Sequence, residues 1–455
     1  MKSRVQWCGN GAARTTSRVV GNGLLLSASI ACIGFAVGGC GGLTPTPQQN
    51  RAQAAIQNVH YTIQDLGVVG PNFNAPGQPF VIANSGWISG TAAVGAAEHA
   101  VLWYAGQMID IGNPGLGGNS LAYGVNESGV TAGEAEDTAA GLSTTEDFCG
   151  FQFLGFTLPT SPTPCVPFVW SGSSMVPLKT LGGVNGVANG INNSGAIAGY
   201  AENTTTDPDC TAPQIYQFKP VVWSQGRIQE LPTGNDAEGV AFAINDRGQV
   251  VGTSGGCASF NPIWLFNLNP VHAVLWDNGV ATDLKSLGGE FNNLAHDINN
   301  RGQVVGGSDV TGDTTSHAFL WTAATGMQDL HTVSDAVDDD TFSVGLGIND
   351  AGQIVGVSSN ADSSIIRAFI RQNGTLVDLN SLISGSTPLY LVTACSITSK
   401  GEIIGIAIDP NTGETHSYLA TPAPGASSAT QPAVKPPVLP NWVRDRFRIA
   451  SPSKQ

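Results

Sequence analysis

The stretch "AINDRGQVVGTS" spans residues 243–254, and close relatives of it recur along the chain. Matching stretches are "GINNSGAIAGYA" at 190–201, "DINNRGQVVGGS" at 297–308 and "GINDAGQIVGVS" at 347–358. Asparagine is favoured at the first position of a type I turn and glycine at the fourth, where glycine tolerates a left-handed backbone. Ile-Asn-x-x-Gly therefore predicts a hairpin turn between two antiparallel strands. We interpret the phrase as scaffold rather than as a chemical site.

The same turn recurs at a regular spacing. Each unit holds an apolar strand such as "HAVLW" (272–276), a strand ending in an acid and an aliphatic residue such as Asp283-Leu284, a strand that runs into Ile-Asn, and the "QVVG" strand. Seven units of four short strands predict an all-β fold, a seven-bladed β-propeller. A linear β-solenoid is the rival architecture, but its repeats are usually shorter. Units of about 50 residues are marked by the turn glycines Gly86, Gly129, Gly195, Gly248, Gly302, Gly352 and Gly401.

The two ends of the repeat region are each incomplete. The stretch "HSYLA" (416–420) copies the apolar strand after the seventh unit, whereas the first unit has only "YTIQDLG" (61–67) and no such strand before it. We therefore expect 416–420 to pair with the first blade and close the ring over residues 60–420. Closure would remove two open sheet edges, which otherwise invite aggregation.

The charge distribution excludes some partners. The chain of 455 residues has a net charge of −15, and 33 of its 34 acids lie between residues 60 and 420 against nine basic residues. Such a surface repels phosphate backbones, so nucleic acid is not expected as a partner. The repeat region is expected to be monomeric.

The N-terminus has the features of an export signal. Basic residues precede the apolar stretch "LLLSASIACIGFAVGG" (24–39), which is too short to span a membrane comfortably. It ends in "VGGC" (37–40), which resembles the bacterial lipobox, and the resemblance implies that Cys40 is lipidated. Ordinary signal cleavage or a retained N-terminal anchor stay open. We expect a signal peptide at 1–39, a tether at 40–59 and a disordered Pro/Ala/Ser-rich tail at 421–455.

A family resemblance rests on the repeat motifs taken in register. "HAFLW" (317–321), Asp329-Leu330, "SLGG" (286–289) and "INDAGQIVG" (348–356) together resemble the HAF repeat of extracellular bacterial proteins. The resemblance covers roughly residues 60–420, and units one and seven are divergent. It implies an exported repeat protein and brings no catalytic residues.

Function is expected where units break the pattern. Three connections of one type carry cysteine and aromatic residues, at 146–165, 210–218 and 257–270, and they should emerge on the same face of the ring. The cysteines suggest the pairs Cys149–Cys165 and Cys210–Cys257, with Cys395 left as a thiol. An aromatic platform for a sugar or a protein partner is expected, formed by Phe151, Phe153, Tyr216, Phe260, Trp264 and Phe266. A small satellite core that only holds long loops in place is the alternative.

Metal and catalytic signals are weaker. "SDAVDDDTF" (334–342) groups Asp338, Asp339 and Asp340, which are hard oxygen ligands that suit calcium, although their spacing matches no known calcium loop. No other cofactor is expected, and the sequence holds no P-loop, HExxH, GxSxG or dinucleotide fingerprint.

These features favour an exported, lipid-anchored binding or scaffolding module at the cell envelope, without enzymatic activity. Its partner would be an extracellular polysaccharide or an envelope protein, and the lipid would tie it to the membrane. Two alternatives stay open: a glycan-acting lyase or hydrolase, because fold does not fix function, and a purely structural surface protein.

Overall fold

A computed structural model gives the fold of the repeat region. It describes residues 59–68, 79–95, 97–112, 118–137, 163–210, 214–257, 271–331, 340–372, 374–423 and 436. Within these ranges, no helix has the length and apolar character needed to cross a membrane. The one helix in the described ranges is the short 3-10 turn η1 (Leu379–Leu382), which Asp378 caps.

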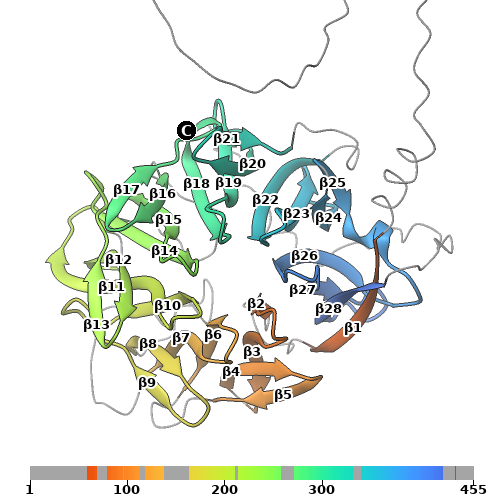
Figure 1. Cartoon of the computed structure of the whole chain (residues 1–455), viewed down its shortest axis with the longest axis horizontal. Helices are drawn as coiled ribbons and strands as arrows, with labels where there is room; N and C mark the ends of the chain where they lie inside the picture. The colour runs from red at the N-terminus through yellow and green to blue at the C-terminus, as the bar shows by residue number, and fades with distance from the viewer. Residues whose placement is uncertain are drawn as a thin grey trace, which may run out of the picture. The chain divides into compact units, whose positions relative to one another are not determined.

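Seven four-stranded antiparallel sheets form a ring, as the repeats predict (Figure 1). Six of them, blades 1 to 6, take four consecutive strands each, with the first strand innermost. Blade 1 consists of β2 (Pro79–Ile82), β3 (Ile88–Val94), β4 (Ala97–Tyr104) and β5 (Gln107–Asp110), and blade 2 of β6 (Ser120–Val125), β7 (Thr131–Glu136), β8 (Cys165–Trp170) and β9 (Met175–Pro177). Blade 3 consists of β10 (Gly186–Ile191), β11 (Ile197–Thr206), β12 (Tyr216–Ser224) and β13 (Arg227–Glu230), and blade 4 of β14 (Glu238–Ile244), β15 (Val250–Gly255), β16 (Val271–Asp277) and β17 (Val280–Asp283). Blade 5 consists of β18 (Gly288–Ile298), β19 (Val304–Val310), β20 (Ser316–Thr322) and β21 (Gly326–Asp329), and blade 6 of β22 (Asp340–Ile348), β23 (Ile354–Asn360), β24 (Ile366–Gln372) and β25 (Thr375–Asp378).

Blade 7 closes the ring with both ends of the repeat region. Its order from the inside is β26 (Tyr390–Ile397), β27 (Ile403–Ile408), β28 (Thr415–Ala423) and then β1 (His60–Val68). The expected pairing of 416–420 with the N-terminal repeat segment is therefore confirmed, and the register joins Ile63 to Ala420. The two ends meet within one blade, since β1 adds the outermost strand to the last sheet. Figure 1 shows β1 lying beside β28 at the rim.

Apolar side chains seal this closure. Tyr61 on β1 and Tyr418 on β28 are fully buried in one cluster with residues of blades 6 and 7. On the other side of blade 7, Ile404 packs against Ile82 and Trp103 of blade 1. Blade 7 thus buries both faces, as a sheet inside a closed ring must.

The sequence repeat and the blade are out of phase. The strand that runs into Ile-Asn is the innermost strand of a blade and "QVVG" is the second, so a blade takes two strands from one repeat unit and two from the next. The cysteine-bearing connections therefore lie between strands two and three of their blades. In an antiparallel sheet these connections share one end with the links to the next blade. We call this side the loop face, and the side with the Asn turns the turn face.

The turn asparagine links each blade to the next. Asn245 Oδ1 accepts hydrogen bonds from Arg247 N and Gln249 N, both at 3.0 Å, while its Nδ2 donates to Asn299 O at 3.0 Å. The Gly248 N–H donates to Asn245 O, which is the hydrogen bond of the predicted turn. Equivalent bonds to the next blade start from Asn126, Asn192, Asn299 and Asn349. The phrase is scaffold, and it acts between blades as well as within them.

A second set of hydrogen bonds runs around the ring from the residue after each turn asparagine or its equivalent. Six of these backbone N–H groups donate to the side chain of the corresponding residue in the next blade, and Ser399 N to Asn84 Oδ1 makes the step from blade 7 to blade 1. Amides and carboxylates alternate around most of this ring, so no two carboxylates are neighbours. Its members are Asn84, Glu127, Asn193, Asp246, Asn300, Asp350 and Ser399.

The recurrent histidines pair with acids. His99 Nδ1 lies 3.0 Å from Asp110 Oδ1, His317 lies 2.9 Å from Asp329, and His416 lies 2.9 Å from Asp65 of β1. In these blades the histidine of strand three meets the acid of strand four. His272 differs, because its partner is Asp236 in the link before its blade. Several strand-four acids also accept a backbone N–H two residues on, as Asp329 does from His331.

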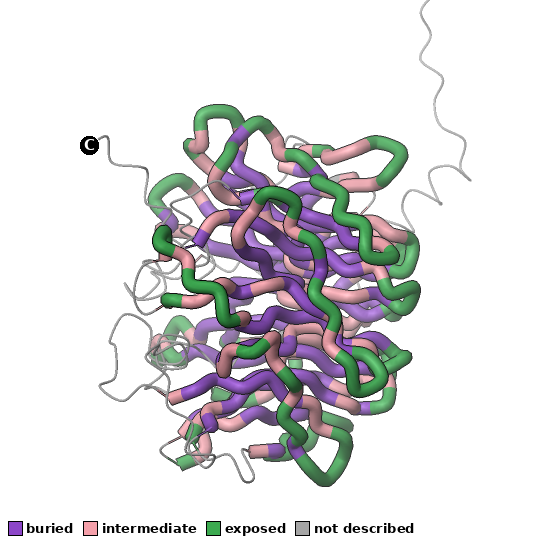
Figure 2. The backbone as a smooth tube through the Cα atoms, turned by 90° about the vertical axis from the view of Figure 1, so that its left-hand side faces the viewer, coloured by how far each residue is buried: buried purple, intermediate pink, exposed green. Residues whose placement is uncertain are grey.

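The core lies between blades. Phe319 of blade 5, for example, clusters with Leu275 and Leu284 of blade 4. Figure 2 shows buried strands running through the ring, with exposed residues gathered at the turns. A rigid scaffold of this kind leaves specificity to its connections.

Candidate functional site

The candidate site lies at the loop face over blades 2, 3 and 4. The connections between β7 and β8, β11 and β12, and β15 and β16 are the three that the sequence singles out, and they belong to consecutive blades. Because each joins strand two to strand three, all three leave the ring on the loop face. Of their residues the structure describes the flanking parts, including 207–210, 214–215 and 256–257.

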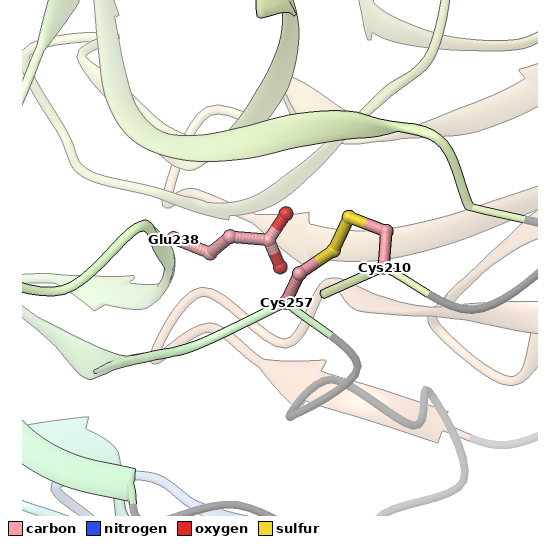
Figure 3. A group of neighbouring side chains, drawn as sticks. All are labelled: Cys210, Glu238 and Cys257. Atoms are coloured by element: carbon pink, nitrogen blue, oxygen red, sulfur yellow. A yellow bond between two sulfur atoms is a disulfide. The ribbon is translucent and has the colours of Figure 1, made fainter. Parts of the chain in front are cut away.

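A disulfide joins two of these connections. Cys210 and Cys257 are bonded, with their Cα atoms 4.7 Å apart. This is the pairing that the cysteine spacing suggests, and it links blade 3 to blade 4 (Figure 3). Cys257 is fully buried and follows β15, while Cys210 ends a turn in which its N–H donates to Asp207 O. The cross-link fixes the starting points of two neighbouring connections relative to each other.

Glu238 lies beside this disulfide. It is the first residue of β14 and pairs with Gly255, two residues before Cys257, so the sheet register brings its side chain to the sulfur atoms. Its Oε1 accepts hydrogen bonds from Phe218 N at 3.1 Å and from Gln214 Nε2 at 2.5 Å. Burial raises the pKa of Glu238 to about 8. The carboxyl group therefore carries a proton at neutral pH, which reduces the cost of keeping it buried.

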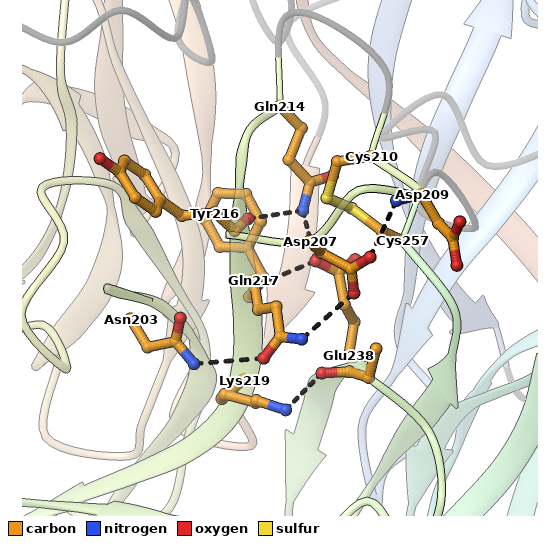
Figure 4. The surroundings of a disulfide bond; sticks show 12 residues. Asn203, Asp207, Asp209, Cys210, Gln214, Tyr216, Gln217, Lys219, Glu238 and Cys257 are labelled. Carbon is orange, nitrogen blue, oxygen red and sulfur yellow. Dashed lines mark hydrogen bonds between the residues drawn. A yellow bond between two sulfur atoms is a disulfide. The ribbon is translucent and has the colours of Figure 1, made fainter. Parts of the chain in front are cut away.

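Polar side chains of β12 and of the segment just before it surround the cluster (Figure 4). Gln217 Nε2 donates to Asp207 Oδ2 at 3.1 Å, and Gln214 Nε2 also donates to Tyr216 O at 3.0 Å. Lys219 Nζ donates to Ala237 O in the link before β14. These bonds hold the start of β12, and with it Tyr216, in a defined position next to the disulfide.

A second buried acid lies in blade 2. Tyr123 Oη donates to Glu134 Oε1 at 2.7 Å, and the sulfur of Cys165 lies 3.3 Å from Glu134 Oε2. Burial raises the pKa of Glu134 to about 8. The pKa of Tyr123 also lies well above its ordinary value, because of burial and then the neighbouring Glu134. A buried acid that keeps its proton at neutral pH is a group that can donate it.

The predicted aromatic platform is described in one residue. Tyr216 is half-buried at the start of β12 and pairs with Thr206. Phe151, Phe153, Phe260, Trp264 and Phe266 lie outside the described residues, so the platform stays a prediction. So does lipidation of Cys40, which lies outside the described residues as well.

The other predicted positions have mixed outcomes. Cys165 takes part in a disulfide, but its expected partner Cys149 lies outside the described residues. Cys395 is a free thiol, as expected, and burial raises its pKa to about 11. Of the calcium candidates, Asp340 makes an ion pair of 3.3 Å with Arg367 and accepts from Ser358 Oγ at 2.6 Å, both within blade 6. Asp338 and Asp339 lie outside the described residues.

Reasoning from the sequence missed a feature of the innermost strands. Every one of them bulges at the same repeat position, where the register of its pairing shifts. His296 and Phe242 occupy this position in neighbouring blades, and their rings lie 5.6 Å apart. Burial lowers the pKa of His296 to about 4, so it is neutral at physiological pH. The sequence carries a signal for this position, because the residue type there varies widely from blade to blade, with Tyr123, Asn189 and Leu346 in other blades.

Comparisons with known proteins assign no family to this chain. No family model matches it, and no curated protein matches it in sequence. A puromycin-hydrolyzing peptidase of Mycobacterium tuberculosis is similar in structure at 12% identity and a TM-score of 0.45, over 83% of this chain and 53% of the peptidase. The β-propeller domain of the Trilobed protease from Pyrococcus furiosus has 7% identity and a TM-score of 0.43, over 76% and 89%. A PL25 ulvan lyase has 11% identity and a TM-score of 0.38, over 81% and 95%. All three TM-scores lie below 0.5, so neither the fold nor an activity is taken from these similarities.

Proposed function

We propose that this protein is an exported, lipid-anchored binding module that holds an extracellular polysaccharide or an envelope protein on the loop face over blades 2 to 4. The observation that carries the proposal is the disulfide between Cys210 and Cys257. This bond joins two neighbouring connections on the loop face, where the longest insertions into the repeat lie. The cross-link sets the relative position of two connections that a ligand on this face would contact.

Physical chemistry supports a sugar or protein ligand at this place. Aromatic side chains stack on sugar rings and dominate protein interfaces, and the three connections supply six candidates, of which the structure describes Tyr216 at the start of β12. The disulfide reduces the conformational freedom that a ligand would otherwise have to remove on binding. The acidic ring surface disfavours phosphate-rich ligands and leaves neutral or cationic ones.

The test uses the full chain in detergent, with the envelope and secreted polysaccharide fractions of the producing organism as probes. One variant replaces Phe151, Phe153, Trp264 and Phe266 with Ala. A matched control replaces Tyr104, an exposed aromatic on the turn face of blade 1, with Ala. Thermal unfolding of all three proteins checks that each is folded.

Saturable binding by the wild type and by Tyr104→Ala, with at least a tenfold loss in the loop variant, would support the proposal. Equal retention of all three proteins would contradict it, as would no binding by any of them, and would favour a purely structural surface protein. Release of shortened or unsaturated sugar products would favour the glycan-acting enzyme instead. In that case the buried acids Glu134 and Glu238 are the first residues to replace with Gln.

A further inference from the structure

The two disulfide cysteines and Glu238 together form a candidate ligand set for a metal ion. One ligand atom from each of Cys210, Cys257 and Glu238 lies within 4.8 Å of the other two. Figure 3 shows the Glu238 carboxylate pointing toward the two sulfur atoms. Among the described residues, this is the group of cysteine, histidine and acid side chains whose ligand atoms lie this close together, and its two cysteines are bonded to each other. Its members come from two blades and from positions 210, 238 and 257, so no local spacing in the sequence reveals it.

One oxygen of Glu238 supplies an independent observation. The side chain is fully buried, and Oε2 has no hydrogen-bond partner among the described residues. The other oxygen, Oε1, is held by Phe218 N and Gln214 Nε2, so the orientation of the carboxyl group is fixed. Buried polar atoms without a partner are rare and each calls for an explanation. Here the atom lies next to two sulfur atoms, which accept hydrogen bonds only weakly.

The dimensions suit a small thiophilic cation. Zinc binds thiolate sulfur at about 2.3 Å and carboxylate oxygen at about 2.0–2.2 Å, which places tetrahedral ligand atoms roughly 3.5–3.8 Å apart. The two sulfurs reach this separation from the bonded state by rotation about the Cα–Cβ bonds, because the Cα atoms are only 4.7 Å apart. The carboxylate already lies within range of both. Three protein ligands leave a fourth position for water or for another side chain.

We propose that reduction of the Cys210–Cys257 disulfide creates a site for a divalent thiophilic cation such as Zn²⁺, bound by the two thiolates and by Oε2 of Glu238. A dithiol reductant gives two electrons and two protons to the disulfide, becoming a disulfide itself while Cys210 and Cys257 become thiols. The cation then displaces the two thiol protons and the carboxyl proton of Glu238. Metal binding is consequently favoured by rising pH.

The bound cation would take over the structural task of the disulfide. In both states the connection after β11 and the connection after β15 stay joined, once by a covalent bond and once through the metal. The reduced protein without metal would lose this link. The metal site would change how Cys210 and Cys257 join the two connections and not which ligand the loop face binds, so a negative result leaves the proposed binding function untouched.

The test compares the full-length wild type, Cys210→Ser/Cys257→Ser and Glu238→Gln. Each protein is reduced with a phosphine, which competes little for metal, and then titrated with Co²⁺ under exclusion of oxygen. The wild type should bind one equivalent more than the double variant, with the charge-transfer absorption of a cobalt–thiolate bond. Glu238→Gln should bind at least tenfold more weakly. The oxidised wild type should match the double variant.

A second measurement identifies the cysteines. Zn²⁺ should slow the alkylation of Cys210 and Cys257 at least tenfold in the reduced wild type, as determined by peptide mass spectrometry, and leave Cys395 unaffected. Equal metal binding by the wild type and the double variant would overturn the proposal. So would unchanged binding by Glu238→Gln, or alkylation of Cys210 and Cys257 that does not respond to metal.

Discussion

The residues of the repeated phrase are those for which the ring leaves little choice. In "QVVG", the glycine lies where the carbonyl of the innermost strand approaches closely: a Cβ on Gly306 would lie 1.9 Å from Leu294 O and 2.9 Å from the ring of Phe319. The same clash arises at Gly199 and Gly356. This glycine therefore makes room for the aromatic residue of strand three and for the bulge of strand one. Its recurrence was visible in the sequence, but its cause was not.

Replacing Gly306 with Ala should destabilise the protein by roughly 3 kcal/mol, because the added carbon overlaps backbone that cannot shift without breaking the sheet. Chemical denaturation measures the loss. Gly345→Ala is the matched control, since its Cβ would meet side-chain carbons at 3.3 Å and 3.4 Å that can move slightly. A loss at Gly306 no larger than that at Gly345 would contradict this account.

Asn245 serves its own turn and the next blade at once, and two substitutions separate these tasks. Asn245→Ala leaves two backbone N–H groups and Asn299 O without their partner and should cost about 2–3 kcal/mol. Asn245→Asp keeps the acceptor for Arg247 N and Gln249 N but loses the donor to Asn299 O and to Gln249 Oε1, so it should cost less. An Asn245→Asp variant as stable as the wild type in urea denaturation would show that the link between blades contributes nothing.

The buried acids predict a pH dependence. The folded state keeps the proton of Glu134 up to a pKa of about 8, whereas the unfolded chain releases it near 4.5. Stability is therefore lost as pH rises between these values. Glu134→Gln should gain roughly 4 kcal/mol relative to wild type between pH 5 and pH 9. Thermal and urea denaturation at both pH values test this, with the exposed Glu230→Gln as a control that should follow the wild type.

At the scale of elements, the sequence predicted the strands and their order but not where a blade begins. A repeat has no intrinsic starting point, and "HAVLW" (272–276) could open or continue a sheet equally well. The phase follows from closure, because β1 adds one outer strand to blade 7 and so fixes the innermost strand of every other blade. The sequence showed the acid of the Asp-Leu pair as a recurrent residue of one strand. Its histidine partner on the adjacent strand became apparent only once the register of the sheet was known.

The disulfide between Cys210 and Cys257 joins two connections, and the cysteines in the sequence suggested this pairing. They gave no indication of the side chains that surround it. Removing it by Cys210→Ser/Cys257→Ser should cost about 4 kcal/mol, since the bond closes a segment of 47 residues. Cys395→Ser, which removes a free thiol, should cost under about 1.5 kcal/mol. Denaturation under non-reducing conditions compares them. A double variant as stable as Cys395→Ser would mean that the disulfide adds nothing to the fold.

At the scale of the whole molecule, the number of recurring turns predicted the number of blades. The unmatched strand copy at 416–420 predicted the closure of the ring. Glu238 could not be assigned to the site from the sequence, because positions 210, 238 and 257 meet only when blade 3 packs on blade 4. The alternation of amides and carboxylates around the turn face could not be predicted from the sequence either. The residues that alternate are about 50 apart in the chain and become neighbours only in the ring.

The arrangement of connections on both faces depends on ring closure, and a cross-link between β1 and β28 tests this closure directly. Thr62 of β1 lies opposite Thr421 of β28. In the full chain, Thr62→Cys with Thr421→Cys should form an intramolecular disulfide under mild oxidation, identified as one cross-linked peptide pair. Thr62→Cys with Glu414→Cys, roughly 20 Å away along the strand, should not. Absence of the 62–421 cross-link, or equal yields from both pairs, would contradict a ring closed by its own first strand.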